Sequence, residues 1–228
     1  MAIAVKICGI NSGAALAAAL AAGADMIGLV FYPRSPRYVT PAQAGEFAGA
    51  AKGRAERVGV LVDPDDALLE TILAAAPLDL LQLHGDESPA RLNEIRGRFG
   101  VPVMKAIRIA EAGDLAQAVP YLSAADRLMF DGKAPTSLKG AMPGGNRVSF
   151  DWAMLKEREI GLPWILSGGL DPDNVGQAIR ASGAGAVDVS SGVEDAPGHK
   201  DPHRIAAFLA AAKQEGKATA PWLAKKSA

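Results

Sequence analysis

The 228-residue sequence is poor in several residue types, and each shortage narrows the possible classes of protein. Its single cysteine, Cys8, cannot form an intrachain disulfide, so nothing indicates a disulfide-stabilised secreted domain. The three histidines and the cysteine lack the spacing of zinc ligands, so we expect no metal. A formal net charge of -1 disfavours non-specific nucleic-acid binding, which needs a basic face.

The sequence also lacks a run that is long and apolar enough to cross a membrane. The uncharged stretch 7–24 comes nearest, but it is mostly alanine and glycine, and Asn11 and Ser12 interrupt it. A spanning helix needs about 20 predominantly apolar residues, and a signal peptide needs a basic start and a stronger apolar run. We therefore expect a cytoplasmic protein without membrane contact.

Eight short apolar runs alternate with longer stretches rich in alanine and leucine. The runs are apolar on both faces and often β-branched, which is typical of strands buried on both sides of a parallel sheet. They are 5–8, 26–31, 58–62, 80–83, 103–107, 128–130, 164–166 and 186–189. Eight strand-then-helix units in a chain of roughly 250 residues predict a single (β/α)8 TIM barrel. An open doubly wound sheet is the alternative, but the segment 8–11 lacks the glycine fingerprint expected there.

The stretches between the runs carry signals for helix starts. An oxygen-bearing side chain caps the first N–H groups of a helix, and proline is harmless at the first helical position. Such a side chain precedes a proline at Thr40, Asp63, Ser88, Asp171 and Asp201. Thr40 with Gln43 also fits a capping box. We predict one catalytic domain over 1–214 and a poorly ordered tail over 215–228.

Polar residues follow the predicted strands, and in a barrel they converge on one end. Charges among apolar strand residues are costly unless they face that end, which is where barrel enzymes build their sites. The two long connections, 32–40 and 131–151, also follow strands and belong to the same end. The candidates are Cys8, Arg34, Arg37, Asp63, His84, Arg108, Asp131, Ser167 and Ser190.

Cys8 and Asp131 are the candidates for acid–base chemistry. Cys8 is either a small buried hydrophobe or a general base, whose thiol a helix starting near Ser12 would make more acidic. Lys6 would assist only if the end of the strand bends. Asp131 directly follows an apolar run, and the next helix starts only near Asp151. A capping role is therefore disfavoured, and we predict a catalytic carboxyl.

Two segments rich in glycine and serine, 167–170 and 190–192, follow the predicted seventh and eighth strands. Small residues let backbone N–H groups approach an anion, and these loops are the usual phosphate site in such barrels. We therefore predict phosphate binding there. Arg37 either clamps a carboxylate with its guanidinium or is a solvated loop charge. His84 either orients a substrate or is a satisfied residue at a strand end.

The segments, taken in order, resemble the phosphoribosylanthranilate isomerase family of tryptophan biosynthesis. The matching motifs are Lys-Ile-Cys-Gly-Ile at 6–10, Gly-Ala-Asp-Met-Ile-Gly-Leu-Val-Phe at 23–31, Ser-Pro-Arg at 35–37, Leu-Gln-Leu-His-Gly-Asp-Glu at 81–87, Phe-Asp-Gly at 130–132, Phe-Asp-Trp at 150–152, Leu-Ser-Gly-Gly-Leu at 166–170 and Val-Asp-Val-Ser-Ser-Gly-Val-Glu at 187–194. Each motif alone is weakly specific, but the ordered set covers nearly the whole chain.

The resemblance implies an Amadori rearrangement of N-(5-phosphoribosyl)anthranilate into the corresponding 1-deoxyribulose compound, with no metal and no cofactor. It implies Cys8 as the general base, Asp131 as the general acid and Arg37 as the group that binds the anthranilate part. The remaining residues predicted to bind substrate are His84, Gly168, Gly169, Asp188, Ser190, Ser191 and Gly192. We expect the partner to be this small phosphoribosyl molecule, and the protein to be a monomer or a homodimer.

Two segments depart from the family pattern, and two other functions stay open. Gly144-Gly145-Asn146-Arg147 stands where the family usually has Gly-Gly-Thr-Gly, and Asn11 stands where it often has threonine. The loss of the last glycine removes a position that tolerates positive φ.

One alternative function is a Schiff-base lyase, which would use a lysine at a strand end. The candidate lysines are Lys6, Lys105 and Lys133. The other alternative is a phosphate-binding barrel without catalysis.

Overall fold

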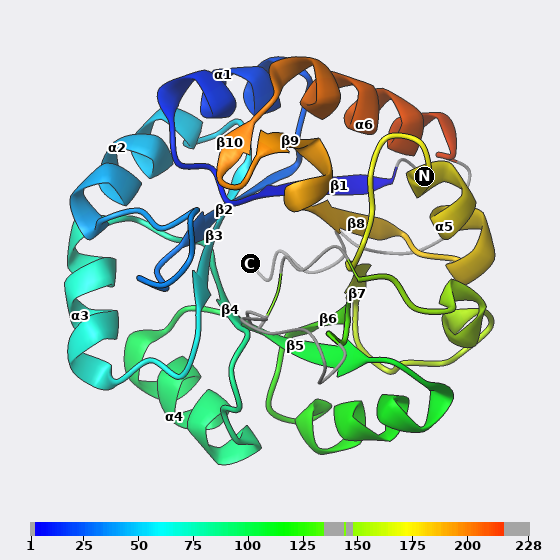
Figure 1. Cartoon of the computed structure of the whole chain (residues 1–228). Helices are drawn as coiled ribbons and strands as arrows, with labels where there is room; N and C mark the ends of the chain where they lie inside the picture. The colour runs from blue at the N-terminus through cyan, green and yellow to red at the C-terminus, as the bar shows by residue number, and fades with distance from the viewer. Residues whose placement is uncertain (1–2, 135–143, 145–147, 217–228) are drawn as a thin grey trace.

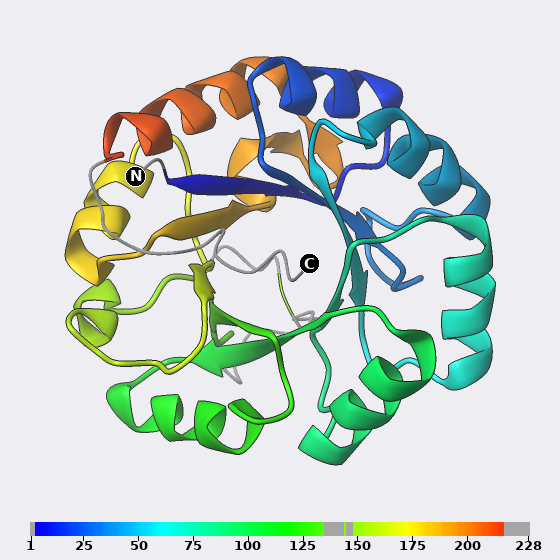
Figure 2. The same ribbon diagram turned by 180° about the vertical axis from the view of Figure 1, so that it is seen from behind.

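The computed structural model describes residues 3–134, 144 and 148–216. At its centre is a closed barrel of eight parallel strands with helices around it (Figures 1 and 2), which confirms the predicted (β/α)8 TIM barrel. The strands are β1 (Ala4–Cys8), β2 (Met26–Val30), β3 (Glu56–Leu61), β4 (Leu80–Leu83), β5 (Val103–Ile109), β6 (Arg127–Gly132), β7 (Trp164–Leu166) and β8 (Ala186–Val189).

The barrel closes at β1, which pairs with both β2 and β8. Lys6 lies opposite Met26 on one side and opposite Asp188 on the other. Alternate side chains of the strands fill the barrel interior, among them Ala4, Met26, Val58, Leu80, Met104, Met129, Ile165 and Ala186. The side chains between them, such as Val5 and Ile27, belong to the larger core under the helices. Burial on both faces explains why the strands are continuous apolar runs in the sequence.

In the described part of the chain, α-helices form five of the connections between strands, a sixth follows the last strand, and 3-10 helices stand at other places. The α-helices are α1 (Gly13–Ala21), α2 (Pro41–Ala51), α3 (Asp66–Ala75), α4 (Pro89–Phe99), α5 (Val175–Ser182) and α6 (Pro202–Gln214). The 3-10 helices are η1 (Ala112–Tyr121), η2 (Trp152–Leu155) and η3 (Ser191–Val193). The predicted caps Thr40, Ser88 and Asp201 each accept a backbone N–H at the start of α2, α4 and α6, and Thr40 completes its capping box.

The predicted helix start at Asp63 is wrong because a residue of another loop occupies its side chain, and the one at Asp171 lies three residues before Asn174, the N-cap of α5. Asp63 has a φ of 46° and accepts the backbone N–H of Asp86, while α3 is capped two residues later by Asp65. The carboxylate of Asp171 accepts the N–H groups of the two residues before Val175, where α5 begins. The local Asp-Pro signal is therefore not sufficient to place a helix start.

A short hairpin follows β8 and lies at the carboxyl ends of the strands. It consists of β9 (Glu194–Ala196) and β10 (His199–Lys200), and it sits inside the ring of helices beside β1 (Figure 1). Gly198 in its turn has a φ of 82°, and a Cβ there would lie 2.4 Å from the Pro36 carbonyl oxygen. Only glycine therefore lets the hairpin pack this closely against the loop after β2.

The end of the described chain follows α6. Glu215 caps α6 and pairs with Arg180 of α5. The rest of the predicted tail, 217–228, lies outside the described residues. Among the helices of the described ranges, none combines the length and the hydropathy needed to span a membrane.

Candidate active site

An open cavity of about 790 Å³ lies at the carboxyl ends of the strands. Ten residues that the sequence pattern singled out line it. They are Cys8, Arg37, His84, Asp131, Ser167, Gly168, Gly169, Asp188, Ser190 and Ser191. The structure therefore brings Cys8 of β1 and Asp131 of β6 to the walls of one cavity, together with both glycine- and serine-rich loops.

Four candidates are not among the residues that line the cavity: Arg34, Asp63, Arg108 and Gly192. Arg108 supports the site from outside, because its Nη2 donates to the carbonyl oxygen of His84 at 3.0 Å. Gly192 lies where the loops after β7 and β8 meet, and a Cβ there would be 1.9 Å from the carbonyl oxygen of Leu170. The packing of the two loops therefore requires glycine at 192.

Lys6 lies in the barrel interior and has no exposed surface. Its Nζ is 2.7 Å from Asp188 Oδ1, and Ser167 Oγ donates to Oδ2 of the same carboxylate at 2.9 Å. A Cβ built on Gly28 would lie 3.1 Å from the Lys6 Nζ and 2.9 Å from the Cys8 Sγ. The amine and the thiol are therefore within about 6 Å of each other. The expectation that Lys6 needs a bent strand is wrong, since residues two apart share a face.

The pKa of the Cys8 thiol is raised, chiefly because burial disfavours the thiolate. Lys6 acts against burial and lowers this pKa, Asp188 raises it further, and Lys200 lowers it. The structure thus reverses the expected direction, which assumed that a helix start would acidify the thiol. Burial also lowers the pKa of Lys6, but Asp188 and Cys8 outweigh it and hold that pKa above its ordinary value. Lys6 is therefore a permanent cation beneath the thiol.

Arg37 is held by Glu194, which also pairs with Lys200, and the sequence pattern singled out neither partner. Its Nε and Nη2 donate to the two carboxylate oxygens of Glu194 at 2.7 and 2.8 Å. Lys200 donates to Glu194 Oε1 at 2.5 Å and to the Ser190 carbonyl oxygen at 3.2 Å. Burial raises the pKa of Glu194, but Arg37 and Lys200 outweigh it and hold that pKa below its ordinary value. Arg37 is therefore a buried, paired cation and not a solvated loop charge.

The ion pair with Glu194 decides which edge of Arg37 faces a ligand. A guanidinium carries five N–H donors, and Glu194 accepts from Nε and from Nη2. The edge formed by Nη1 and the second hydrogen of Nη2 still offers two parallel donors to a carboxylate. Because Arg37 lines the cavity, this edge is the part of the side chain that suits the predicted clamp.

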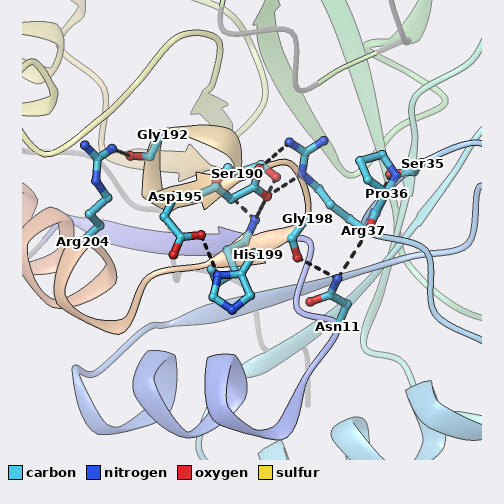
Figure 3. A network of polar contacts seen from close by, with 12 residues as sticks. Asn11, Ser35, Pro36, Arg37, Ser190, Gly192, Asp195, Gly198, His199 and Arg204 are labelled. Atoms are coloured by element: carbon cyan, nitrogen blue, oxygen red, sulfur yellow. Dashed lines mark hydrogen bonds and ion pairs between the residues drawn. The ribbon is translucent and has the colours of Figure 1, made fainter.

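Long-range pairing explains why Glu194 and Lys200 were missed. The Pro-Gly pair at 197–198 signals a turn and therefore a hairpin. No spacing rule, however, links Arg37 to a carboxylate 157 positions away. Asn11, one of the departures from the family pattern, contributes to the same region, because its Nδ2 donates to the Gly198 carbonyl oxygen at 2.9 Å (Figure 3). The other departure from the family pattern is the segment 144–147. Its first residue, Gly144, lines the cavity, and 145–147 lie outside the described residues.

Asp131 caps no helix, as predicted, and each of its oxygens has a hydrogen-bond partner at the cavity wall. Oδ1 accepts from the backbone N–H of Gly132 at 3.0 Å, and Oδ2 lies 3.2 Å from Nε2 of His84. The other ring nitrogen of His84 lies 2.9 Å from Nε2 of Gln82, which also lines the cavity and was not foreseen. The ring of His84 is thus held on both sides.

The charged side chains around Cys8 form two clusters, Lys6 with Asp188, and Arg37 and Lys200 with Glu194. Three cations against two carboxylates leave a surplus of positive charge on this side of the cavity. Such a surplus favours anionic ligands and a thiolate. In the part of the chain that the structure describes, no group of three or more His, Cys, Asp or Glu side chains is arranged to hold a metal ion.

Known proteins match both the sequence and the fold. The family described as N-(5'phosphoribosyl)anthranilate (PRA) isomerase matches residues 5–211. An N-(5'-phosphoribosyl)anthranilate isomerase of Paramagnetospirillum magneticum is 56% identical over 93% of this chain and 98% of the relative. The crystal structure of phosphoribosyl anthranilate isomerase from Thermotoga maritima has a TM-score of 0.83 at 35% identity, over 93% of this chain and 99% of that one. A crystal structure of phosphoribosyl anthranilate isomerase in complex with reduced 1-(o-carboxyphenylamino)-1-deoxyribulose 5-phosphate has a TM-score of 0.80 at 33% identity, over 93% of this chain and 99% of that one. This chain belongs to the N-(5'-phosphoribosyl)anthranilate isomerase family.

Proposed function

We propose that this chain isomerises N-(5-phosphoribosyl)anthranilate to 1-(2-carboxyphenylamino)-1-deoxyribulose 5-phosphate, with Asp131 as general acid and Cys8 as general base. The observation that carries the proposal is that both side chains line one cavity. They come from β6 and β1, which are not neighbours in the closed barrel. A ligand can therefore lie between the acid and the base.

The proposed reaction moves two protons in opposite directions. Asp131 gives a proton to the ring oxygen of the furanose as the bond between this oxygen and C1 breaks, and the nitrogen lone pair forms an iminium at C1. The Cys8 thiolate then removes the hydrogen from C2, and the electron pair of that bond forms the C1–C2 double bond of an enolamine. A proton shift from the 2-hydroxyl to C1 gives the ketone. The reaction is redox-neutral, and one proton is given for each one taken.

The base must be a thiolate when it acts, although burial raises the pKa of Cys8. Lys6 and Lys200 act against this effect, and Lys6 holds its charge because Asp188 lies 2.7 Å from its Nζ. The iminium at C1 adds a positive charge next to the C2 hydrogen and makes that hydrogen more acidic. Asp188 is therefore assigned a supporting role: it keeps Lys6 charged beneath the thiol.

The two anionic groups of the substrate match two parts of the cavity. The phosphate is assigned to the loops after β7 and β8, at Gly168, Gly169, Ser190 and Ser191, which line the cavity and whose small side chains let an anion come close to the backbone. Gly168 has a φ of 91°, and a Cβ there would lie 2.3 Å from the Gly132 nitrogen, so no larger residue fits. The anthranilate carboxylate is assigned to the free edge of Arg37.

The three candidate lysines do not favour a Schiff-base lyase. A lysine that forms an imine must first lose its proton, whereas the pKa of Lys6 is raised. Lys105 is paired with Glu87 at 2.6 Å and is not among the residues that line the cavity. Lys133 is also outside that set and lies near Asp114. A barrel that only bound phosphate would have no use for both Cys8 and Asp131.

Two substitutions test the proposal. Cys8→Ser and Asp131→Asn are each expected to lower kcat by at least about 100-fold, followed as the loss of substrate fluorescence. Asp86→Asn makes the same chemical change at a side chain that is 88% exposed, and it should leave kcat unchanged. Circular dichroism checks that each variant is folded. Wild-type turnover in Cys8→Ser or Asp131→Asn would contradict the assigned roles, and an inactive wild-type protein would contradict the function itself.

A further inference from the structure

The side chain of Asp131 ends a row of three buried polar groups that runs along the cavity wall from β4 to β6. Gln82 belongs to β4, His84 follows the same strand two residues later, and Asp131 belongs to β6. The exposed fractions are 1% for Gln82, 7% for His84 and 4% for Asp131. Gln82 Nε2 lies 2.9 Å from His84 Nδ1, and His84 Nε2 lies 3.2 Å from Asp131 Oδ2. Each group therefore depends on the next one for its hydrogen bond.

The hydrogens along this row can be assigned from the chemistry of the groups. An amide nitrogen only donates, so Nδ1 of His84 accepts, and the single proton of the neutral ring is on Nε2. Nε2 then donates to Asp131 Oδ2, while the Gly132 N–H donates to Oδ1. Both oxygens of Asp131 thus face donors, and this arrangement suits the carboxylate. A general acid, however, must carry a proton before it can give one.

A protonated Asp131 requires the opposite arrangement. A proton on Oδ2 must point at a ring nitrogen that accepts, so the ring proton has to be on Nδ1 of His84. Nδ1 then needs an acceptor in the place where the Gln82 amide nitrogen stands. The amide oxygen of Gln82 would supply it, because nitrogen and oxygen exchange places when the terminal amide turns through about 180° with little change in shape.

The surroundings of Gln82 permit this turn. Its Oε1 is buried and has no hydrogen-bond partner within the described part of the chain. The only other contact of its Nε2 that a turn would break in the described structure is with the sulfur of Met129, at 3.3 Å. Thioether sulfur is a weak acceptor. Turning the amide gives Oε1 the partner that it lacks and moves Nε2 to the former place of Oε1, so each arrangement leaves one buried group of this amide without a partner in the described part of the chain, and the turn adds no further unpaired group.

We propose that Gln82 is a positioning residue whose amide turns over so that His84 supports Asp131 both with and without its proton. The inference rests on the proposed role of Asp131 as general acid. When the acid is loaded, Nε2 of His84 passes its proton to Oδ2, and Nδ1 takes one proton from water in the cavity. When the acid has given its proton to the ring oxygen, Nδ1 returns a proton to water, and Nε2 regains one from water. His84 is neutral in both resting arrangements. Over one turnover it takes two protons from water and returns one, the difference is the proton given to the ring oxygen, and Cys8 restores it to water when its thiol loses the proton taken from C2.

The position of the ring proton tests the proposal without any activity measurement. The chain has three histidines, and nitrogen NMR of the full chain, made with 15N-labelled histidine, separates a ring nitrogen that carries hydrogen from one that does not. His199→Gln and His203→Gln assign the signals of the two other rings. We expect the proton on Nε2 of His84 in the wild-type protein, and on Nδ1 in Gln82→Glu, because a carboxylate only accepts. An Nε2 proton retained in Gln82→Glu would overturn the proposal.

Steady-state kinetics separate a positioning role from a merely structural one. Gln82→Glu holds the ring proton of His84 on Nδ1, and Gln82→Met forms a hydrogen bond with neither form of the ring. Each variant should therefore lower kcat by roughly tenfold, the effect of one hydrogen bond lost from the transition state. KM should stay within about twofold, since the phosphate and carboxylate contacts are untouched. Gln43→Glu, the same change in the exposed capping box of α2, is the matched control and should keep both constants. Unchanged kcat in Gln82→Glu and Gln82→Met would refute the inference, whereas an inactive wild-type protein would refute only the proposed function.

Discussion

Replacing Lys6 with methionine should slow the reactions of the Cys8 thiolate. Methionine has nearly the shape of lysine without its charge, and Lys6 is completely buried, so the change removes one positive charge and little else from the barrel interior. The charge matters because Lys6 is the strongest influence that lowers the pKa of Cys8 against burial. Without Lys6, burial and Asp188 both oppose the thiolate, and less of it is present at any given pH.

The size of the effect follows from the distance between the two groups. Lys6 Nζ and Cys8 Sγ are within about 6 Å of each other, as their distances of 3.1 and 2.9 Å from the same point beside Gly28 require. At an effective dielectric constant of about 20, two unit charges at 6 Å interact by about 3 kcal/mol. A loss of this size lowers the thiolate population at fixed pH by roughly a hundredfold. The buried Asp188 also loses its partner, which costs about 3–5 kcal/mol of stability.

Alkylation by iodoacetamide measures the thiolate directly, because Cys8 is the only cysteine of the chain. We expect the rate at pH 8 to fall by roughly a hundredfold in Lys6→Met, by less in Lys200→Met, and not at all in Lys213→Met, whose lysine pairs with Asp25 on another part of the surface. Unfolding would expose the thiol and speed alkylation, so it cannot imitate the expected result. An unchanged rate in Lys6→Met would refute the electrostatic account of the base.

Three further predictions concern binding, acid stability and packing. Arg37→Ala should raise KM for the anthranilate substrate, yet leave it nearly unchanged for an analogue without the carboxylate; an equal rise for both would contradict the clamp. The pKa of Glu194 is held below the ordinary value of 4.5, so its share of stability is present above that pH and is lost as the pH falls further. Glu194→Gln should therefore flatten the acid side of a plot of unfolding free energy against pH, and a curve parallel to the wild type would count against the ion-pair cluster. Gly192→Ala should lower the unfolding free energy by roughly 1–3 kcal/mol or more, because the new Cβ meets the Leu170 carbonyl oxygen. Gly97→Ala, at an open position in the last turn of α4, should raise it by up to about 1 kcal/mol, and denaturant titration compares the two.

The architecture was predictable because burial on both faces of each strand leaves a direct mark on the sequence. The run 80–83 coincides with β4, and 164–166 and 186–189 coincide with β7 and β8. Helix starts were less certain, since Asp63-Pro64 and Ser88-Pro89 look alike locally. Ser88 caps α4, whereas Asp63 accepts the N–H of a residue in the next loop. Contacts between segments decide such cases, and local sequence does not contain them.

The positions of the site residues were predictable, but their partners were not. In a parallel barrel the carboxyl ends of all strands lie at the same end of the barrel. A polar residue that follows a strand therefore lies at that end, which is why Cys8 and Asp131 could be placed on the cavity from the sequence. Whether Asp188 points inward depends on strand register, and the pairing of β8 with β1 sets it opposite Lys6. That ion pair joins residues 182 positions apart. The two residues meet only because the barrel closes, so no local sequence pattern predicts the pair.

The two halves of the cavity support opposite protonation chemistry. On the side of β1, β8 and the hairpin, cations outnumber carboxylates, and the surplus favours loss of a proton from Cys8. On the side of β4 and β6, Asp131 is hydrogen-bonded by a backbone N–H and by His84, which can change the site of its ring proton without changing its charge. A fixed cation bonded to Asp131 would hold it as a carboxylate, and an unpaired carboxylate beside Cys8 would hold it as a thiol. Because the closed barrel sets these two environments on separate strands, one small cavity can hold an acid and a base that do not neutralise each other.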